Sequence, residues 1–566
     1  MWIKKGHEAS VEEVFLRNME VSSLDDINEW FKKSYADGYK IDRLDEAVEL
    51  ALSFKDKKVT IVGDYDGDGI TSTTILKLAL TGAGFKDVSF RIPKRFSEGF
   101  GINDKIIDEI SDGLIITCDN GVAQVDAIKR AKENGLTVII IDHHLPVEDE
   151  NGEAILPPAD VIIDPQAIEN SADFKEYCGA GLSWKFARKL LGKTALASKL
   201  IALSAIGTVT DVVSLREENY VIVRNGLKTL QNERDLTGLS ALVSALGLSR
   251  CITAKDIGFK IGPTLNASSR MNDDGAKDAV ELLSFTGPYE TAIAMAERLV
   301  AVNEQRKEAK KLGVITAKAR IDEECLYGDI PLVVYVPSTP EGIIGIIAGN
   351  LAEENHVPCI VVTDTEDGIL KGSGRSYGNY HMKKELDKCS DLLVRYGGHS
   401  GAAGLSLKKE NLDELRDRLN QNAADYEYEP PTDLYYDLEI QAKEIPHYID
   451  ELKKFEPFGY GNPEIVFKIN GFSVTPRYGT FKKLMGADMS IVKLYSSNAT
   501  AIGFDMAERM NTIDKPQNLD MIGTLSDNYF NGSVEHQIEF ADFVNNEIQM
   551  KETPLAMKLK MMASSR

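Results

Sequence analysis

The residue types that could do chemistry begin with a cluster of carboxylates near residue 65. Asp64, Asp66 and Asp68 lie within five residues in the run GDYDGDG, where glycines allow the chain to bend sharply. Taken alone, this turn is compatible with a calcium loop or a capping turn. Other acids and two adjacent histidines end later apolar runs: Asp119 in CDNG, Asp142-His143-His144 in IDHH, and Asp211 in VTDVV.

Together these residue types favour a metal site. Carboxylates crowded at one sheet edge would cost several kcal/mol through repulsion and desolvation unless cations neutralise them. Carboxylate oxygens combined with one or two imidazoles suit Mn²⁺ or Mg²⁺ better than structural zinc. Two such ions lower the pKa of a bridging water and hold both the attacking and the leaving oxygen of a phosphoryl centre. The residues therefore predict two-metal hydrolysis of phosphodiester bonds.

The elements that must position these residues are short apolar runs separated by helical patterns. Four of them are expected to be strands: KKVTIV, DGLIITC, LTVIIID and ADVIIDP. Alternation of such runs with helices predicts a doubly wound parallel sheet, in which functional groups gather beyond the carboxyl ends of the strands. Asp64, Asp119 and Asp142 each lie where a predicted strand ends.

The rest of the chain predicts an α/β protein of several domains, because 566 residues exceed what one core usually supports. A long connecting helix, a second α/β unit beginning at PLVVYV and a C-terminal small β-barrel follow the first domain. The expected boundaries are N-terminal helices 1–58, first α/β domain with a helical extension 59–284, connecting helix 285–320, second α/β domain 321–429, β-barrel 430–546 and basic tail 547–566.

Composition limits the cellular setting and the mode of binding. Six scattered cysteines without Cys-x-x-Cys pairs argue against zinc ribbons and disulfide scaffolds, and they fit a reducing cytoplasm. We expect no export signal and no membrane anchor. A formal charge of -23 argues against a broad basic surface that binds duplex DNA, but it allows a narrow basic channel that binds one strand.

The ordered motifs carry a family resemblance. GDYDGDG, CDNG, IDHH and VTDVV resemble the motifs of the DHH phosphoesterase superfamily, and GGHSGAAG resembles its DHH-associated C-terminal domain. The segments IPKRFSEGFGIN, CGAG, GSGRS and FEPFGYGNPE further resemble the RecJ family of bacterial single-stranded-DNA-specific exonucleases, of which this chain looks like a divergent member. The resemblance covers about residues 10–546, and it makes the C-terminal barrel an OB-fold.

The resemblance implies 5′-to-3′ release of mononucleotides from single-stranded DNA in DNA repair or recombination, with two Mn²⁺ or Mg²⁺ ions. It implies a monomer, with single-strand-binding protein or a helicase as candidate protein partners. By motif, the metal ligands or their immediate supports would be Asp64, Asp66, Asp68, Asp119, His143 and Asp211. The catalytic residues would be Asp142, His143, His144 and His399. The substrate-binding residues would be Arg95, Arg270, Ser373, Arg375, Ser376, Gly397, Gly398 and His399.

Two stretches depart from the family pattern. Thr264 in GPTLNASSR stands where the family usually has arginine, and Thr339-Pro340 and Asn350 replace a Trp-His pair and another arginine. These changes remove phosphate donors and leave the substrate open. One alternative is a phosphodiesterase for short oligoribonucleotides or cyclic dinucleotides, and another is a non-catalytic, RecJ-like DNA-binding scaffold. Basic residues at 298–320 are either a solvated helical face or a compensating strand-binding surface.

Overall fold

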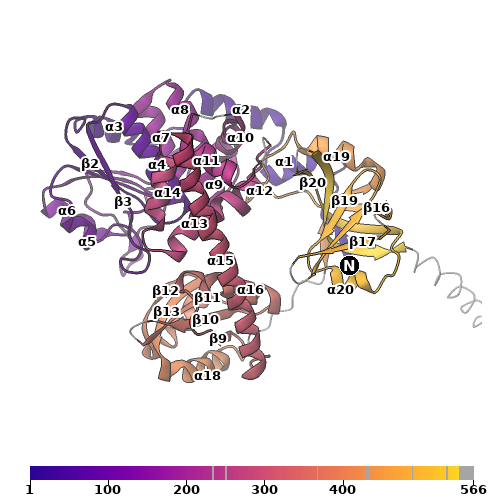
Figure 1. Ribbon diagram of the computed structural model, residues 1–566. Helices are drawn as coiled ribbons and strands as arrows, with labels where there is room; N and C mark the ends of the chain where they lie inside the picture. Colours follow the sequence, from indigo (N-terminus) through magenta and orange to yellow (C-terminus); the bar gives the residue numbers. More distant parts are fainter. Residues whose placement is uncertain are drawn as a thin grey trace, which may run out of the picture.

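The computed structural model describes residues 1–546 except 233–234, 249–250, 366–367, 425, 427–432, 478, 487–488 and 531–532. The predicted basic tail, 547–566, and the expected boundary between residues 429 and 430 lie outside the described residues. The chain forms an upper body, a lower body and a lateral body, and the long helix α15 runs from the upper one into the lower one (Figure 1).

The upper body contains the predicted doubly wound sheet, and all of its strand pairs are parallel. In spatial order its strands are β3 (Asp87–Arg91), β2 (Lys58–Val62), β4 (Leu114–Cys118), β5 (Thr137–Ile141) and β8 (Val161–Ile163). Alternate strand residues enter two hydrophobic cores on opposite faces, because side chains alternate along a strand. One core includes α3 (Leu44–Leu52), α4 (Gly67–Gly82), α7 (Gly179–Leu191) and α9 (Ile201–Thr210), and the other includes α5 (Asp104–Asp108) and α6 (Val125–Glu133).

A helical layer extends this body, as the mainly helical pattern after residue 178 predicts. Most of it belongs to the same hydrophobic core as α4 and α9. Its elements are α8 (Ala195–Lys199), α10 (Glu217–Asn232), α11 (Thr237–Ala245), α12 (Ala254–Asp256), a π-helical turn (Ile257–Ile261), α13 (Gly262–Met271) and α14 (Gly275–Leu283). Helix α15 (Tyr289–Glu323) then confirms the predicted connecting helix.

The lower body is the second α/β unit, built on a mixed sheet. Its strands are β12 (Leu393–Gly398), β13 (Ala402–Lys408), β11 (Ile369–Arg375), β10 (Cys359–Asp364) and β9 (Leu332–Tyr335), of which only β9 and β10 pair in parallel. One face packs against α16 (Glu341–Asn355) and the end of α15, and the other against α17 (Met382–Asp387) and α18 (Leu412–Asn422). The GSGRS segment, residues 372–376, therefore lies in β11 up to Arg375 and is not an isolated turn.

The lateral body is the OB-like sheet that the C-terminal strand pattern predicts. Its spatial order is β15 (Leu438–Gln441), β16 (Phe467–Ser473), β20 (Asn518–Phe530), β21 (Ser533–Asn545), β19 (Thr500–Gly503), β18 (Ile491–Tyr495) and β17 (Lys482–Met485). Helices α19 (Ile445–Leu452) and α20 (Ala507–Asn511) complete it. Buried apolar side chains of both the sheet and α19 share one core.

The N-terminal segment belongs to the lateral body as well as to the upper one. Strand β1 (Trp2–Lys4) pairs in parallel with β14 (Leu434–Tyr436), although the sequence patterns indicate only helices there. Helices α1 (Val11–Met19) and α2 (Leu24–Tyr35) bury Val14, Phe15 and Ile27 in the core of the OB-like body. The N-terminus accordingly lies beside the OB-like sheet (Figure 1).

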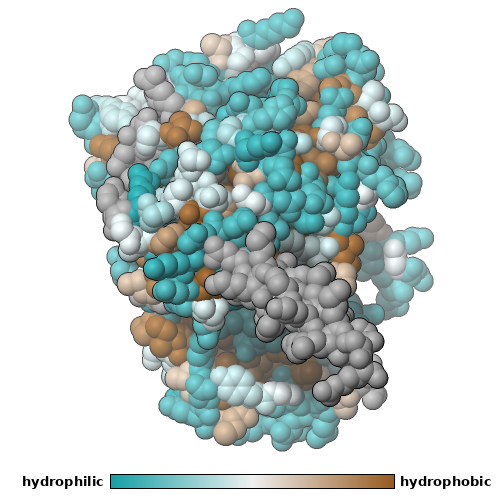
Figure 2. All heavy atoms as spheres, turned by 90° about the vertical axis from the view of Figure 1, so that its right-hand side faces the viewer, coloured by the Kyte–Doolittle hydropathy of each residue, from teal (hydrophilic) through white to brown (hydrophobic). Residues whose placement is uncertain are grey.

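The face that carries the OB-like body is mostly hydrophilic, with scattered hydrophobic residues (Figure 2). None of the helices within the described residues combines the length and the apolar character that crossing a membrane requires.

Candidate metal centre and adjoining cationic pocket

Three neighbouring strands bring acids to one edge of the parallel sheet. Asp119 directly follows β4 and Asp142 directly follows β5, and their backbone N–H groups extend the strand ladder to Ile141 and Ile163, at 3.0 Å each. Asp119 adopts a left-handed conformation with φ of 61°, which ends the strand. Asp64 lies two residues beyond β2. The strand-end prediction for these three acids is therefore confirmed.

The GDYDGDG turn places its other two acids through hydrogen bonds to helix ends. Asp66 is the N-cap of α4, and its carboxylate accepts from the backbone N–H groups of Asp68 and Gly69 at 3.0 Å. Asp68 is buried, and its carboxylate accepts from Gly179 and Ala180, the first residues of α7, at 2.6 and 2.9 Å. These contacts fix both carboxylates before any ligand is present.

Residue 69 must be glycine because the strand and the helix approach closely at this turn. A Cβ atom there would lie 2.4 Å from the backbone oxygen of Asp64. The glycines of the motif therefore allow α4 to begin against the end of β2, which brings Asp64 and Asp68 to the same edge.

His143 joins the carboxylates that come from different elements. Its Nε2 lies 3.0 Å from Oδ1 of Asp119, 3.7 Å from Oδ2 of Asp68 and 3.8 Å from Oδ2 of Asp211. Asp211 caps the C-terminal end of α9, so it reaches the sheet edge from a helix rather than from a strand. His143 thus contacts two acids, Asp68 and Asp211, that lie 143 residues apart in sequence.

Donor atoms at this edge form three overlapping groups in which all atoms lie within 4.8 Å of one another. Each group could hold one metal ion. Asp119 belongs to two of the groups, and His143 belongs to two of them. The three groups are Asp64, Asp66 and Asp119; Asp68, His143 and Asp211; and Asp119, His143 and His144.

Burial and mutual repulsion make these acids unfavourable as bare anions. Burial and the charge of Asp66 raise the pKa of Asp64 well above its usual value, and burial with Asp68 does the same for the pKa of Asp119. The pKa of Asp211 rises to about 8 for the same reasons, burial and Asp68. Oδ1 of Asp64 is buried and has no hydrogen-bond partner among the described residues. A buried oxygen without a donor is what a metal ligand would be before its ion binds.

Asp142 supports the site rather than joining the three donor groups. Its carboxylate accepts from the N–H groups of Val122 and His143 at 2.9 and 2.8 Å, and it lies 2.8 Å from Nδ1 of His144. Burial opposes the charge on Asp142, yet its hydrogen bond and charge pairing with His144 hold its pKa below the usual value. Burial likewise opposes the charge on His144, but Asp142 raises the pKa of that imidazole to about 9. Asp142 thereby orients the ring of His144 and holds the backbone of His143.

A cationic pocket of about 240 Å³ adjoins the acids, between the upper and lower bodies. Arg95 and Arg270 line it from the upper body, and Ser373 and Arg375 line it from β11 of the lower body. Lys371 and Glu341 also line it, and they pair with each other at 3.9 Å. Within the described part of the chain, none of the three arginines has a carboxylate partner at ion-pair distance. Arg95 lies over the ring of Tyr65, Arg270 donates to the backbone oxygen of Gly342 at 3.1 Å, and Arg375 donates to Ser373 at 3.1 Å.

The first turns of α16 form another wall of the pocket. A Cβ atom on Gly342 would lie 2.1 Å from the backbone oxygen of Arg270, and one on Gly345 would lie 2.7 Å from a terminal nitrogen of Arg375. Gly342 therefore lets α16 approach the backbone of Arg270, and Gly345 leaves room for the guanidinium group of Arg375. Burial lowers the pKa of Arg270 to about 10, with Arg95 and Arg375 adding repulsion. Such crowded cations favour an anionic ligand.

The remaining predicted substrate-binding residues do not line this pocket. The hydroxyl of Ser376 donates to the backbone oxygen of Tyr380. Gly397 and Gly398 end β12, and His399 is exposed in the connection to β13, where its ring accepts from the N–H of Gly401 at 3.2 Å. Their roles stay predictions.

Several residues of the site escaped the sequence patterns. Asp164 follows β8 as the other acids follow their strands, it is buried beside Asp142, and its pKa rises to about 8 mainly through burial. Its strand ending in VIIDP carried the same signal. Tyr65 and Lys371 line the pocket, and Asn266 accepts the N–H of Gly67 at 2.8 Å. These three depend on contacts between distant segments, for which a single sequence gives no signal.

Comparison with known proteins agrees with this architecture. A family model described as the DHH family, N-terminal domain, matches residues 58–208. The DHHA1 domain matches residues 329–425, and the RecJ OB domain matches residues 436–542. The fold, the domain order and the acid–histidine cluster together define a protein of the DHH class.

Individual relatives narrow this class. The single-stranded-DNA-specific exonuclease RecJ of Bacillus subtilis is 32% identical over 519 residues, which are 89% of this chain and 63% of that protein. The Haemophilus influenzae protein of the same name is also 32% identical, over 75% of this chain and 77% of its own length. The chain belongs to the RecJ family. It spans less than two thirds of the Bacillus subtilis relative.

Solved structures agree. RecJ from Thermus thermophilus in complex with Mn²⁺ has a TM-score of 0.74 at 24% identity, over 96% of this chain and 79% of that chain. Exonuclease RecJ bound to manganese has a TM-score of 0.59 at 29% identity, over 68% of this chain and 96% of that chain. The fold expectation is therefore confirmed.

Proposed function

We propose that this protein is a metal-dependent exonuclease that releases mononucleotides from the 5′ end of single-stranded DNA. The observation that carries this proposal is the adjacency of two unlike sites: a cluster of metal-ligand atoms and a pocket lined by three arginines without carboxylate partners. Tyr65 connects them, because it lies between Asp64 and Asp66 and lines the pocket. A strand could therefore place one phosphate among the arginines and the next ester bond at the acids.

The donor set fits two Mn²⁺ or Mg²⁺ ions. Six residues would hold them: Asp64, Asp66, Asp68, Asp119, His143 and Asp211. Carboxylate oxygens with one imidazole suit these ions, and the manganese-bound RecJ structure at 29% identity supports the same choice. When bound, the ions would activate water and stabilise charge on the phosphoryl oxygens. Asp142 would act by orienting the ring of His144 and by holding the backbone of His143 through the hydrogen bonds described above.

The arginine pocket supports cleavage next to a terminal phosphate, and the family resemblance makes that terminus the 5′ end. A terminal phosphate monoester carries about -1.5 to -2 charges at neutral pH, whereas a diester phosphate in the strand carries one. Three guanidinium groups in about 240 Å³ suit the more highly charged terminal group. Arg95, Arg270 and Arg375 would bind it, with Ser373 as a further donor. His399, Ser376, Gly397 and Gly398 are proposed as outer phosphate contacts on the family resemblance alone.

The test is degradation of a 5′-phosphorylated single strand with Mn²⁺, labelled at either end in parallel reactions. We expect labelled mononucleotide to appear at once from the 5′ label and only late from the 3′ label. The Asp119→Asn variant should release none. Duplex DNA, a short oligoribonucleotide and a cyclic dinucleotide are compared in the same assay. Preference for either of the last two, or no Mn²⁺-dependent release from the 5′ end, would reject the proposal.

We propose in addition that the protein acts as a monomer in the cytoplasm, with single-strand-binding protein or a helicase as partner. The cysteines support the reducing compartment, since Cys118, Cys178, Cys359 and Cys389 are buried as free thiols. The expected domain boundaries also stay proposals. Analytical ultracentrifugation tests the monomer, and a pull-down with purified single-strand-binding protein tests the partner.

A further inference from the structure

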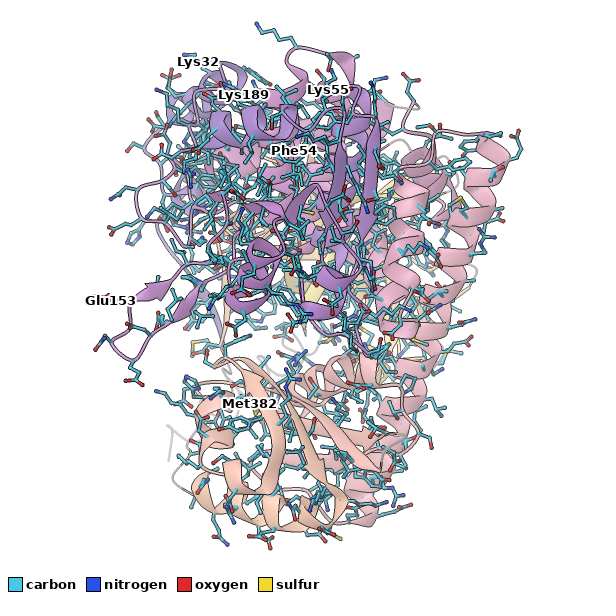
Figure 3. The ribbon with its side chains drawn as sticks, turned by 90° about the vertical axis from the view of Figure 1, so that its left-hand side faces the viewer. Lys32, Phe54, Lys55, Glu153, Lys189 and Met382 are labelled. Carbon is cyan, nitrogen blue, oxygen red and sulfur yellow. The ribbon has the colours of Figure 1, made fainter. Side chains whose placement is uncertain are left out.

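Helix α15 presents one continuous face to both bodies that it connects. Its buried residues recur every three or four positions, as on one side of a helix, except for one gap between Asn303 and Gly313. They are Ala292, Ala296, Leu299, Asn303, Gly313, Ala317 and Ile321. Leu299 belongs to the core of the upper body, whereas Ala317 and Ile321 belong to a core of the lower body. The helix runs along both bodies in Figure 3.

The same face changes character where the helix crosses from one body to the other. Arg306 and Lys310 continue the spacing between Asn303 and Gly313, so they occupy the inward face at this level. Both are half-buried, and burial lowers the pKa of each. Within the described residues, neither has a carboxylate at ion-pair distance.

Basic residues elsewhere on α15 behave differently. Lys307 pairs with Glu304 at 2.7 Å, and Lys318 pairs with Glu354 on α16. Both lysines are exposed. The structure thus separates the basic residues of this segment into paired ones on the surface and two half-buried ones without a counter-ion.

Arg306 is held in place by a neutral partner. Its Nε and a terminal nitrogen donate to Oδ1 of Asn303 at 3.2 and 2.9 Å, and the amide of Asn303 donates to the hydroxyl of Thr264 at 3.0 Å. Thr264 and Asn303 are buried. An amide fixes the guanidinium group without neutralising its charge, so the remaining donors stay available to an anion.

The held cation lies near the arginine pocket. Thr264 and Arg270 belong to the same helix, α13, and Arg270 lines the pocket. The charge of Arg306 also contributes to lowering the pKa of Arg270, and Arg306 acts in the same way on Lys310. A row of cations therefore leads from the pocket along the inward face of α15.

We infer that Arg306 and Lys310 bind the backbone phosphates of the single strand on the 3′ side of the scissile ester. This inference rests on the proposed function and adds a second phosphate subsite to it. Thr264 stands where the family usually has arginine, and it carries no charge. Its hydroxyl accepts from Asn303, which in turn positions Arg306. The subsite would read the sugar-phosphate backbone and no base, so it favours a strand longer than one nucleotide.

The test compares two variants that remove equal charge from the same helix. Binding of a long fluorescent single strand is measured by anisotropy over a range of salt concentrations, in the non-cleaving Asp119→Asn protein. The double variant Arg306→Gln/Lys310→Gln should bind about 100-fold more weakly, at about tenfold per lost contact. Its salt-dependence slope should fall by about 1.4, since each contact to a single strand contributes about 0.7. The control Lys307→Gln/Lys318→Gln should change affinity less than threefold.

Two further measurements keep the outcome decisive. The charge-keeping variant Arg306→Lys/Lys310→Arg should bind within about tenfold of the parent, which separates the loss of charge from a change of side-chain shape at these positions. In the cleaving protein, the glutamine variant should raise KM for a long strand more than KM for a 5′-phosphorylated dinucleotide. Equal binding by the glutamine variant and the control, or an unchanged salt slope, would overturn the inference. Failure of the proposed function would instead appear as absent turnover in the unaltered protein.

Discussion

Replacing Arg270 by glutamine should stabilise the protein while weakening its hold on phosphate. The pKa of this guanidinium falls from its usual value to about 10, first through burial and then through the charges of Arg95 and Arg375. An unfolded chain keeps the usual value, so the folded state bears a penalty at every pH below about 10. At about 1.4 kcal/mol per pKa unit, the penalty is at most about 3 kcal/mol. The lost hydrogen bond to Gly342 offsets about 1 kcal/mol, which leaves a gain of about 1–2 kcal/mol.

The measurement is urea unfolding in buffer without phosphate, followed by the same titration with added inorganic phosphate. We expect a higher midpoint for Arg270→Gln without phosphate, and a smaller phosphate-induced increase than in the parent. Arg416→Gln is the control, because Arg416 pairs with Glu324 at 2.8 Å and donates to the backbone oxygen of Val333. That variant should be destabilised. If Arg270→Gln lowers the midpoint as Arg416→Gln does, the idea of an anion-dependent pocket is refuted.

Two other predictions concern the contacts of Gly345 and of Asp142. Gly345→Ala should raise KM for a 5′-phosphorylated strand about tenfold with a smaller change in kcat, because the new Cβ would lie 2.7 Å from a terminal nitrogen of Arg375 and displace it; an unchanged KM in steady-state kinetics would contradict this. Asp142→Asn should reduce the stability of the metal-free protein most at and just below pH 6.5, because the raised pKa of His144 contributes stability below its unfolded value of 6.5 and loses it as pH rises to about 9. Urea midpoints of parent and variant that stay equally far apart from pH 6 to pH 9 would argue against that coupling.

The parallel sheet and its acids could be predicted because the signals are local. Apolar runs ending at Val62, Cys118 and Ile141 are read residue by residue, and parallel strands necessarily bring their carboxyl ends to one edge. Asp211 was also predicted, although it caps a helix and reaches the cluster from another direction. The metal chemistry follows from residue types once the edge is known.

The pocket could be predicted only in part, since it depends on how two bodies meet. Arg95, Arg270 and Arg375 came from motif resemblance, but their shared cavity is created by the first turns of α16. No sequence period marks Gly345 as the residue against which Arg375 packs. The sequence alone does not distinguish Arg306 and Lys310 from the other basic residues of α15, because only the structure shows which side of that helix faces inward.

The pairing of β1 with β14 has a consequence for how the protein is made. Trp2–Lys4 leave the ribosome about 430 residues before their strand partner Leu434–Tyr436. At a synthesis rate of about 5–20 residues per second, β1 emerges roughly 20–90 s before the strand with which it pairs. Helix α1, whose Phe15 packs in the core of the OB-like body, waits as long with an apolar surface uncovered. Chains that stop before β14 should therefore be prone to aggregate and to be engaged by chaperones, even when their sheet and metal site have already folded.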